Sequence, residues 1–151
     1  MSNSKIKEGD SVPAFKLQDQ NGNWFDSESL KGQAYVLYFY PKDDTPGCTA
    51  QACSFRDAIE DFKGIGVQVI GISSDSPESH KAFAERHRLP FTLLSDKGNK
   101  LRKSFGVPGG FFGLVPGRVT YVVDKNGVVQ KIFNSQLQVT KHVSEALEVF
   151  A

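Results

Sequence analysis

Runs of mainly apolar residues recur along the chain and predict buried β-strands. The four clearest are "AYVLYFY" (34–40), "VQVIGI" (67–72), "VTYVVD" (119–124) and "VVQKIF" (128–133), and "FTLLS" (91–95) is a shorter candidate. Nearly continuous apolar runs such as the first two are typical of strands buried on both faces of a sheet. The last two runs flank Lys125-Asn126-Gly127, and Asn-Gly between two strands predicts an antiparallel hairpin because both residues tolerate positive φ.

Helical patterns fill the intervals between these runs. They cover residues 46–63, 76–88, 98–105 and 140–150. Ser76 can cap the second of these helices, and Pro77 fits its first position. The order of elements predicts an α/β fold, in which a mixed central sheet carries helices on both faces. The thioredoxin fold has this plan.

Residues 1–33 form an N-terminal extension to this plan. The extension contains two short strand candidates, "FKLQD" (15–19) and "NWFD" (23–26), on either side of the turn signal Asn21-Gly22. The chain shows no internal repeat, low-complexity tract or linker-like stretch. We therefore expect a single domain over residues 1–151, a common length for one domain.

Composition and charge narrow the functional classes. Hydrophobic residues make up 39% and charged residues 23% of the chain, which is typical of a soluble globular protein. The formal net charge of +1 provides no basic field for nucleic acid. The N-terminus "MSNSKIKEGD" does not resemble a secretory signal, and no apolar run approaches the roughly 20 residues that span a bilayer. The two cysteines then suggest a reducing compartment and catalytic, redox or core roles, because a structural disulfide is disfavoured there.

Both cysteines lie near the start of the first predicted helix, in "TPGCTAQAC" (45–53). Thr45 suits the N-cap and Pro46 the next position, so Cys48 falls in the first turn. Backbone N–H groups in that turn lack helical partners, and the helix dipole is positive there. A thiolate is stabilised at such a position, which makes Cys48 a candidate nucleophile. Gly47 leaves the neighbouring backbone open to a small reactant.

The spacing places Cys48 and Cys53 on different sides of the helix. Cys48 begins an apolar stripe that continues through Ala52 and Phe55, whereas Cys53 is rotated away from it by roughly 140°. Their Cα atoms are about 8.6 Å apart in a regular helix, and a disulfide usually needs less than about 7 Å. The pair can therefore bond only if part of the helix unwinds. Two interpretations stay open: small core residues, or a redox pair in which Cys53 resolves a sulfenic acid on Cys48.

These residues resemble a known family. The motif Pro41-x-x-x-Thr45-x-x-Cys48 is similar to the active-site motif of peroxiredoxins, and "FYPKDDTPGCTAQACSFRD" (39–57) resembles the peroxiredoxin Q, or bacterioferritin comigratory protein, subgroup. The resemblance covers essentially the whole chain. It also includes "GDSVPAFKLQDQNG", "GISSDSPESHKAF", "LPFTLLSDKGNKLRKSFGV" and "PGRVTYVVDKNGVV". A four-residue motif alone is weak, but this ordered set is very specific.

The resemblance implies an antioxidant enzyme that reduces hydrogen peroxide and organic hydroperoxides. It makes Cys48 the peroxidatic nucleophile, Cys53 the resolving cysteine and Arg118 the active-site arginine. Thr45 would offer its hydroxyl to the peroxide or the thiolate, and Pro41 would shield the pocket from water. The resemblance further implies no metal or organic cofactor, thioredoxin or a similar dithiol as reductant, and a monomer. The cytoplasm is the expected location, with the chloroplast, for a mature form, as the alternative.

The remaining features carry less functional weight. His80 and His87 are too far apart for the i, i+4 pair of a zinc helix, so no metal site is predicted. Phe111 and Phe112, in "VPGGFFGLVPG" (107–117), belong either to a packed surface loop or to an apolar rim near Arg118. The charged segment "DKGNKLRK" (96–103) is interpreted as solvated.

Two other functions stay open on the residues alone. One is a redox-sensing or chaperone-like binding module that uses the disulfide as a switch. The other is a dithiol oxidoreductase, against which the lack of a Cys-x-x-Cys motif argues.

Overall fold

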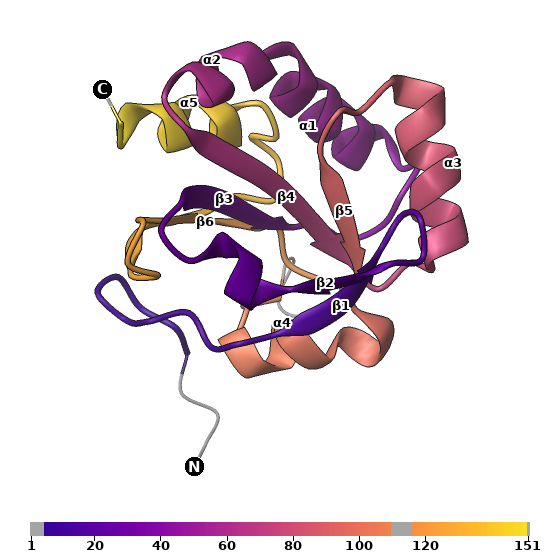
Figure 1. The fold of residues 1–151 in the computed structure, drawn as a ribbon. Helices are drawn as coiled ribbons and strands as arrows, with labels where there is room; N and C mark the ends of the chain where they lie inside the picture. Colours follow the sequence, from indigo (N-terminus) through magenta and orange to yellow (C-terminus); the bar gives the residue numbers. More distant parts are fainter. Residues whose placement is uncertain (1–4, 110–115, 151) are drawn as a thin grey trace.

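A mixed β-sheet forms the centre of the structure (Figure 1). The computed structural model describes residues 5–109 and 116–150. The sheet has the strand order β2-β1-β5-β4-β3-β6-β7. The strands are β1 (Lys16–Asp19), β2 (Trp24–Asp26), β3 (Ala34–Phe39), β4 (Val67–Ser73), β5 (Thr92–Ser95), β6 (Val119–Val123) and β7 (Val129–Asn134). All the predicted strands, including the two short ones of the N-terminal extension, are confirmed.

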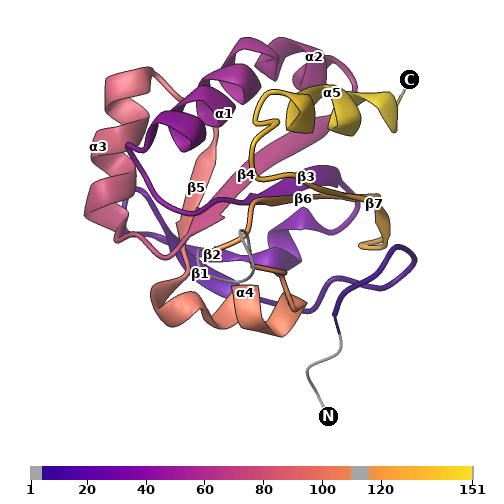
Figure 2. The same cartoon turned by 180° about the vertical axis from the view of Figure 1, so that it is seen from behind.

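The direction of the strands follows from their connections. β3, β4 and β5 run parallel, because helices connect them and carry the chain back to the same edge. β6 pairs antiparallel with β3, and β7 pairs antiparallel with β6 at the edge of the sheet (Figure 2). The predicted hairpin is confirmed, but in its turn only Gly127 has positive φ. The Asp124 carboxylate accepts the N–H groups of Asn126 and Val128, and this holds the turn instead.

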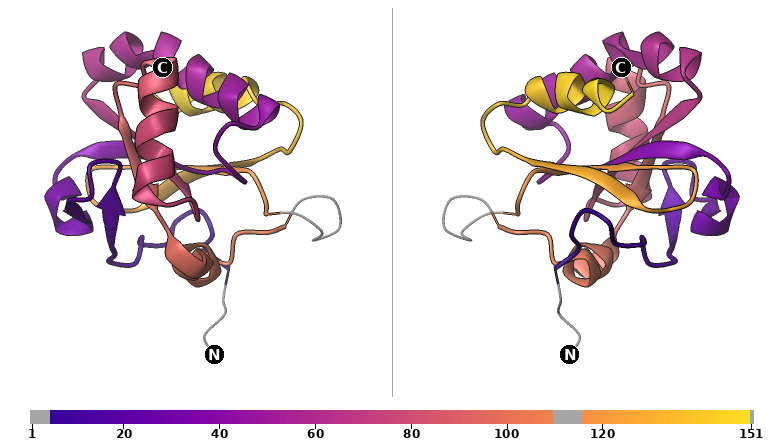
Figure 3. Two further views of the ribbon diagram at one scale, coloured as in Figure 1. Left: turned by 90° about the vertical axis from the view of Figure 1, so that its right-hand side faces the viewer. Right: turned by 90° about the vertical axis from the view of Figure 1, so that its left-hand side faces the viewer.

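Helices cover both faces of the sheet, as predicted. They are α1 (Pro46–Asp57), α2 (Ile59–Gly64), α3 (Pro77–His87), α4 (Lys100–Phe105) and α5 (Lys141–Glu148), with short 3-10 helices at Ser27–Leu30 and Lys97–Asn99. Seen along the sheet, α1, α2 and α5 lie on one side and α4 lies on the other (Figure 3). Among the described residues, no helix combines the length and apolar character needed to cross a bilayer.

Strand β3 supplies both layers of the hydrophobic core. Tyr38 faces the cluster beneath α1, α2, α3 and α5, and Leu37 faces the cluster that contains Phe105 of α4. Side chains alternate between the two faces of a strand, so a strand with a core on each side must be apolar at every position. This requirement explains the unbroken run at 34–40.

The first predicted helix, over 46–63, is divided in the structure. The backbone leaves the helical region at Ala58 (φ −98°, ψ 5°), which separates α1 from α2. The Ala58 N–H is shared between the carbonyls of Ser54 and Phe55, as in a tightened final turn. The two parts pack on different surfaces, since α1 contacts α5 whereas α2 contacts β4. The break lets each part follow its own partner.

A buried histidine predicts how stability depends on pH. His142 of α5 donates through Nε2 to the Ser135 carbonyl (2.8 Å), and its Nδ1 lies 2.7 Å from the Thr120 hydroxyl. Burial lowers the pKa of His142 to about 4. In the unfolded chain the imidazole binds a proton below about pH 6.5, whereas the folded protein resists protonation until about pH 4. The contribution of His142 to stability is therefore full above pH 6.5 and is lost as pH falls towards 4.

We expect the free energy of unfolding to fall by about 2 kcal/mol more between pH 7.5 and pH 5 in the wild-type protein than in His142→Gln. Urea unfolding at several pH values measures this difference. His87→Gln is the control, because His87 is only partly buried. Parallel pH curves for wild type and His142→Gln would contradict the prediction.

Candidate active site

Cys48 lies in the first turn of α1 and is almost completely buried. Pro46 occupies the first helical position, as predicted. Thr45 occupies the N-cap position with extended backbone, but its side chain makes no capping hydrogen bond. Its hydroxyl donates instead to the Lys42 carbonyl (2.9 Å), within the loop that precedes the helix. The first N–H groups of α1 are therefore not taken up by a side-chain cap and can stabilise an anion beside Cys48.

Arg118 lies against the start of α1, although it is 70 positions further along the chain. It directly precedes β6 and is 5% exposed. A methyl group added to Gly47 would lie only 3.0 Å from Arg118 Nη2, so the guanidinium rests against the backbone next to Cys48. The structure thus brings Arg118 against the helical turn that carries Cys48, 70 positions earlier in the chain. Pro41, at the start of the loop that precedes α1, is half-buried.

Two neutral groups hold the Arg118 side chain. Nη1 donates to Oε1 of Gln51 (2.6 Å), and Nε donates to the backbone carbonyl of Gln136 (3.2 Å). Gln51 is fully buried, three residues after Cys48 on α1. Sequence reasoning did not assign Gln51 this contact. The signal available was a polar residue beside the apolar stripe of the helix.

A second buried arginine braces the site from the other face of the sheet. Arg102 of α4 donates to the Tyr40 carbonyl (2.9 Å) and to the Gly117 carbonyl (2.7 Å). Tyr40 directly precedes Pro41, and Gly117 directly precedes Arg118. Burial lowers the pKa of Arg102, and the nearby Asp96 carboxylate opposes this effect. One guanidinium therefore ties together the two segments that carry the site.

The burial of Arg102 corrects the interpretation of 96–103 as a solvated segment. Asp96 and Arg102 are both buried. The Asp96 carboxylate accepts the N–H groups of Leu101 and Arg102 at the start of α4 (2.8 and 2.9 Å). A charged run can be partly buried where each charge finds such partners. Phe111 and Phe112 lie outside the described residues.

Cys53 lies on the same helix as Cys48, as predicted. Both cysteines are free thiols, and Cys53 is only partly buried. Because α1 is continuous from Pro46 to Asp57, the five-residue separation holds the two thiols on different sides of the helix. Chemically, the site combines a buried thiol, uncapped N–H groups and a fixed positive charge.

Comparison with known proteins relates this arrangement to one family. The model of the AhpC/TSA family matches residues 9–132. "Peroxiredoxin Q, chloroplastic" from Populus jackii is 56% identical over 146 residues, which cover 97% of this chain and 68% of the relative. The protein of the same name from Arabidopsis thaliana is 58% identical over 145 residues, which cover 96% of this chain and 67% of the relative.

Solved structures show the same fold. Peroxidoxin BcpB from Mycobacterium tuberculosis superposes with a TM-score of 0.86 at 36% identity, over 95% of each chain. Peroxiredoxin Q from Xanthomonas campestris superposes with a TM-score of 0.79 at 29% identity, over 89% of this chain and 90% of that one. The predicted thioredoxin fold is confirmed.

The contact between Gly47 and Arg118 predicts a separation of stability from reactivity. In Gly47→Ala the new methyl group should displace the guanidinium, which Gln51 and Gln136 hold in place. Alanine is the better helix former by up to about 1 kcal/mol, so the melting temperature should not fall. We expect the Cys48 thiol to react with hydrogen peroxide about tenfold more slowly, because the charge beside it is misplaced.

The measurement is the rate of loss of free thiol, followed by rapid alkylation and mass spectrometry. Gly64→Ala is the matched control, since a methyl group at this helical glycine would meet nothing within 4 Å. A Gly47→Ala protein that reacts at the wild-type rate would show that the position of Arg118 does not matter.

Proposed function

Because this chain belongs to the AhpC/TSA family, within its peroxiredoxin Q group, and is a thiol-dependent peroxidase, we propose that Cys48 is its peroxidatic cysteine and Cys53 its resolving cysteine. The observation that carries the proposal is the buried Cys48 thiol at the uncapped start of α1, beside the fixed guanidinium of Arg118. In a thiol-dependent peroxidase, the sulfur reacts as a thiolate and needs hydrogen-bond donors around it. The N–H groups of the first turn and the guanidinium of Arg118 are such donors beside Cys48.

In the first step, the Cys48 thiolate attacks one oxygen of the peroxide ROOH. The S–O bond forms as the O–O bond breaks, and the leaving alkoxide takes up a proton to become ROH. Cysteine is thereby oxidised to sulfenic acid while the peroxide is reduced. Arg118 and the N–H groups of the first turn stabilise the negative charge that passes from sulfur to oxygen. The Thr45 hydroxyl and the Pro41 ring complete the pocket as hydrogen-bonding group and water shield.

In the second step, Cys53 attacks the sulfenic acid on Cys48. The S–S bond forms, and the hydroxyl leaves as water. The first turns of α1 must unwind for this, because the helix keeps the two thiols apart. Gln51 lies between the two cysteines, so the same opening breaks its hydrogen bond to Arg118. Arg118 therefore lacks its hydrogen bond to Gln51 for as long as the disulfide exists.

In the third step, a dithiol protein of the thioredoxin kind reduces the disulfide by thiol exchange. Its two thiols become a disulfide, and Cys48 and Cys53 return as thiols. This cycle acts on hydrogen peroxide and organic hydroperoxides and needs no metal or organic cofactor. It would serve antioxidant defence and redox homeostasis.

We propose that the chain acts as one domain, since β1, near its start, and α5, near its end, both pack onto the same sheet or its helices. The monomeric state and the cytoplasmic location stay predictions. The curated relatives described above are named chloroplastic, which favours the chloroplast alternative.

Turnover separates the roles of the two cysteines. With thioredoxin, thioredoxin reductase and NADPH, Cys48→Ser should reduce peroxide consumption to the background rate. Cys53→Ser should keep the first oxidation of Cys48 within about threefold of wild type but lose at least about tenfold in thioredoxin-dependent turnover. A wild-type protein that oxidises once and never turns over would instead support the redox-switch function. An active Cys48→Ser protein would exclude the proposed nucleophile.

The disulfide itself is tested by intact mass. One equivalent of hydrogen peroxide should lower the mass of wild-type protein by about 2 Da, as two thiols lose their hydrogens. Amide hydrogen exchange should accelerate over residues 47–54 in the oxidised form and stay slow in α3, which serves as the internal control. A persistent gain of one oxygen, or disulfide-linked dimers, would contradict an intramolecular pair.

A further inference from the structure

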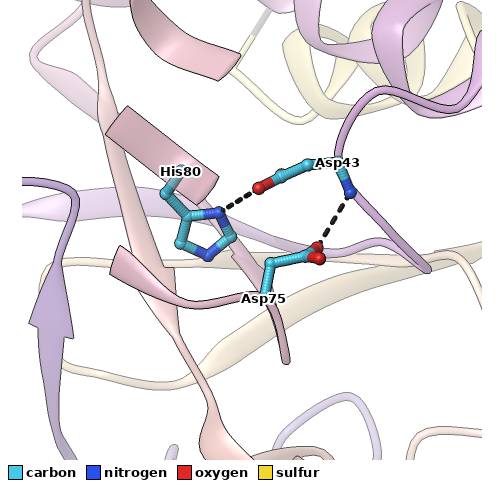
Figure 4. A group of neighbouring side chains, drawn as sticks. All are labelled: Asp43, Asp75 and His80. Atoms are coloured by element: carbon cyan, nitrogen blue, oxygen red, sulfur yellow. Dashed lines mark hydrogen bonds and ion pairs between the residues drawn. The ribbon is translucent and has the colours of Figure 1, made fainter. Parts of the chain in front are cut away.

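A buried cluster outside the reacting groups connects α3 to the loop that precedes Cys48 (Figure 4). It consists of Asp43, Asp75 and His80. His80 comes from the first turn of α3, and Asp43 comes from the loop between β3 and α1. The side chains of both are almost completely buried. Nothing in the reaction steps above uses these residues.

The contacts of His80 fix where its ring must carry protons. Nε2 lies 3.0 Å from the Leu94 carbonyl, which can only accept, so Nε2 bears a hydrogen. Nδ1 lies 2.8 Å from Oδ2 of Asp43. A bare Nδ1 would direct its lone pair at a carboxylate oxygen, so a proton must lie between the two atoms. A tetrahedral zinc ion does not fit there, because ligand bonds of about 2.0–2.1 Å keep its ligand atoms about 3.3 Å apart.

The surroundings of Asp43 keep this carboxylate ionised. Oδ1 accepts the Tyr40 hydroxyl (2.6 Å), and Oδ2 accepts the Ser79 hydroxyl (2.8 Å). Burial raises the pKa of Asp43, but the hydrogen bond and charge of the histidine and the two hydroxyl donors outweigh burial and leave the pKa below its usual value. Burial, and then the charge of Asp43, raise the pKa of Tyr40, so the phenol stays a donor. The shared proton therefore resides on His80.

We propose that His80 is an imidazolium whose ion pair with Asp43 positions the Pro41–Thr45 loop, and through it the start of α1, for the reaction at Cys48. His80 and Asp43 are positioning residues, since neither reaches the reacting atoms. This role rests on the proposed function of Cys48.

The connections of Asp43 show how the pair acts on the loop. The Asp43 N–H donates to Oδ2 of Asp75 (2.8 Å), which also accepts the Ser73 hydroxyl (2.7 Å) from the end of β4. Asp43 is thus held through its backbone by the sheet and through its side chain by α3. Only Asp44 separates it from Thr45, the N-cap residue of α1. A shift of Asp43 would move the start of the helix.

The titratable groups that face the His80 ring are Asp43 from the loop, Tyr40 from the end of β3 and Asp75 from the segment after β4. The Asp75 carboxylate accepts the Asp43 N–H, and one of its oxygens lies within 4.8 Å of a His80 ring nitrogen. Arg102 approaches from the far side of Tyr40 and binds only its backbone carbonyl. With these neighbours, we expect replacement of His80 and replacement of Asp43 to change the rate of Cys48 oxidation by different amounts.

His80→Gln leaves the buried Asp43 carboxylate without a positive partner, which is the costly way to break such a pair. Asp43→Asn leaves a pair that can become neutral, because the amide N–H can donate to Nδ1 of an uncharged ring while the amide oxygen accepts the Tyr40 hydroxyl. We expect the rate of Cys48 oxidation to fall at least about tenfold in His80→Gln, and to fall by a smaller factor in Asp43→Asn, which loses the ion pair but keeps a hydrogen bond. His87 lies on the same helix and is only partly buried, so Cys48 of the control variant His87→Gln should be oxidised at the wild-type rate.

The protonation state is measured directly in the reduced wild-type protein. With ¹⁵N-labelled histidine, nuclear magnetic resonance at pH 7.5 should show hydrogens on both ring nitrogens of His80, assigned by comparison with His80→Gln or, if that variant does not fold, with His87→Gln and His142→Gln. In Asp43→Asn the ring should become neutral, with a hydrogen on Nε2 only. A neutral His80 ring in the wild-type protein would overturn the proposal. So would a His80→Gln protein that folds and oxidises at the wild-type rate.

The spectroscopic result does not depend on which cysteine reacts. An inactive protein with a charged His80 would therefore contradict the proposed function. An active protein with a neutral His80 would contradict the proposed ion pair.

Discussion

The hydrogen bond between the guanidinium of Arg118 and the amide of Gln51 joins the two halves of the fold beside Cys48, the proposed nucleophile. Gln51 belongs to α1, which lies between β3 and β4 in the parallel half of the fold, and Arg118 opens the antiparallel half at β6. Pairing of β6 with β3 brings the two halves together, because Val119 lies opposite Phe39 at the end of β3 from which the chain leads to α1. Sheet register thus decides that a positive charge faces the first turn of that helix.

The helix that carries the site is well anchored at one end and weak at the other. Phe55 is fully buried and stacks on Tyr38 (ring centroids 4.5 Å apart), which fixes the C-terminal part of α1 to the sheet. The first turns contain Gly47, Cys48 and Thr49, which are poor helix formers, and the N-cap side chain makes no hydrogen bond to them. A helix built in this way can open locally at its start while the core below stays intact. The proposed disulfide requires an opening of this kind.

The fold could be read from the sequence because its main elements have local causes. The strand at 34–40 is apolar at every position since it has a core on each face, and Pro77 follows the capping Ser76 at the start of α3. The Cys48 position could be predicted for the same reason, as it depends on the adjacent Thr45-Pro46. The break at Ala58 could not, because it reflects which surfaces α1 and α2 meet.

The hydrogen-bond partners of the buried polar residues could not be predicted from the sequence either. Arg102 appears in a run of charged residues, yet its two carbonyl partners, Tyr40 and Gly117, are 62 and 15 positions away. The contact of His80 with Asp43 spans 37 positions, so the histidine could only be judged by its spacing along its own helix. Contacts of this length depend on the register and packing of the whole sheet, which no local pattern encodes.

The buried charges around the site differ in how they are balanced, and the difference bears on the chemistry. His80 is matched by the carboxylate of Asp43, so that pair adds no net charge and serves only to hold a loop. Arg102 has the carboxylate of Asp96 nearby. Within the described part of the chain, the hydrogen-bond acceptors of Arg118 are an amide and a backbone carbonyl. Neutral acceptors satisfy the N–H donors without cancelling the charge, and a buried charge left in this state is unfavourable until a counter-ion is present. In the proposed reaction, the sulfur of Cys48 is the anion that the start of α1 can place beside Arg118. The same buried charge that makes the arginine costly to the fold is therefore the partner that the proposed reaction at Cys48 requires.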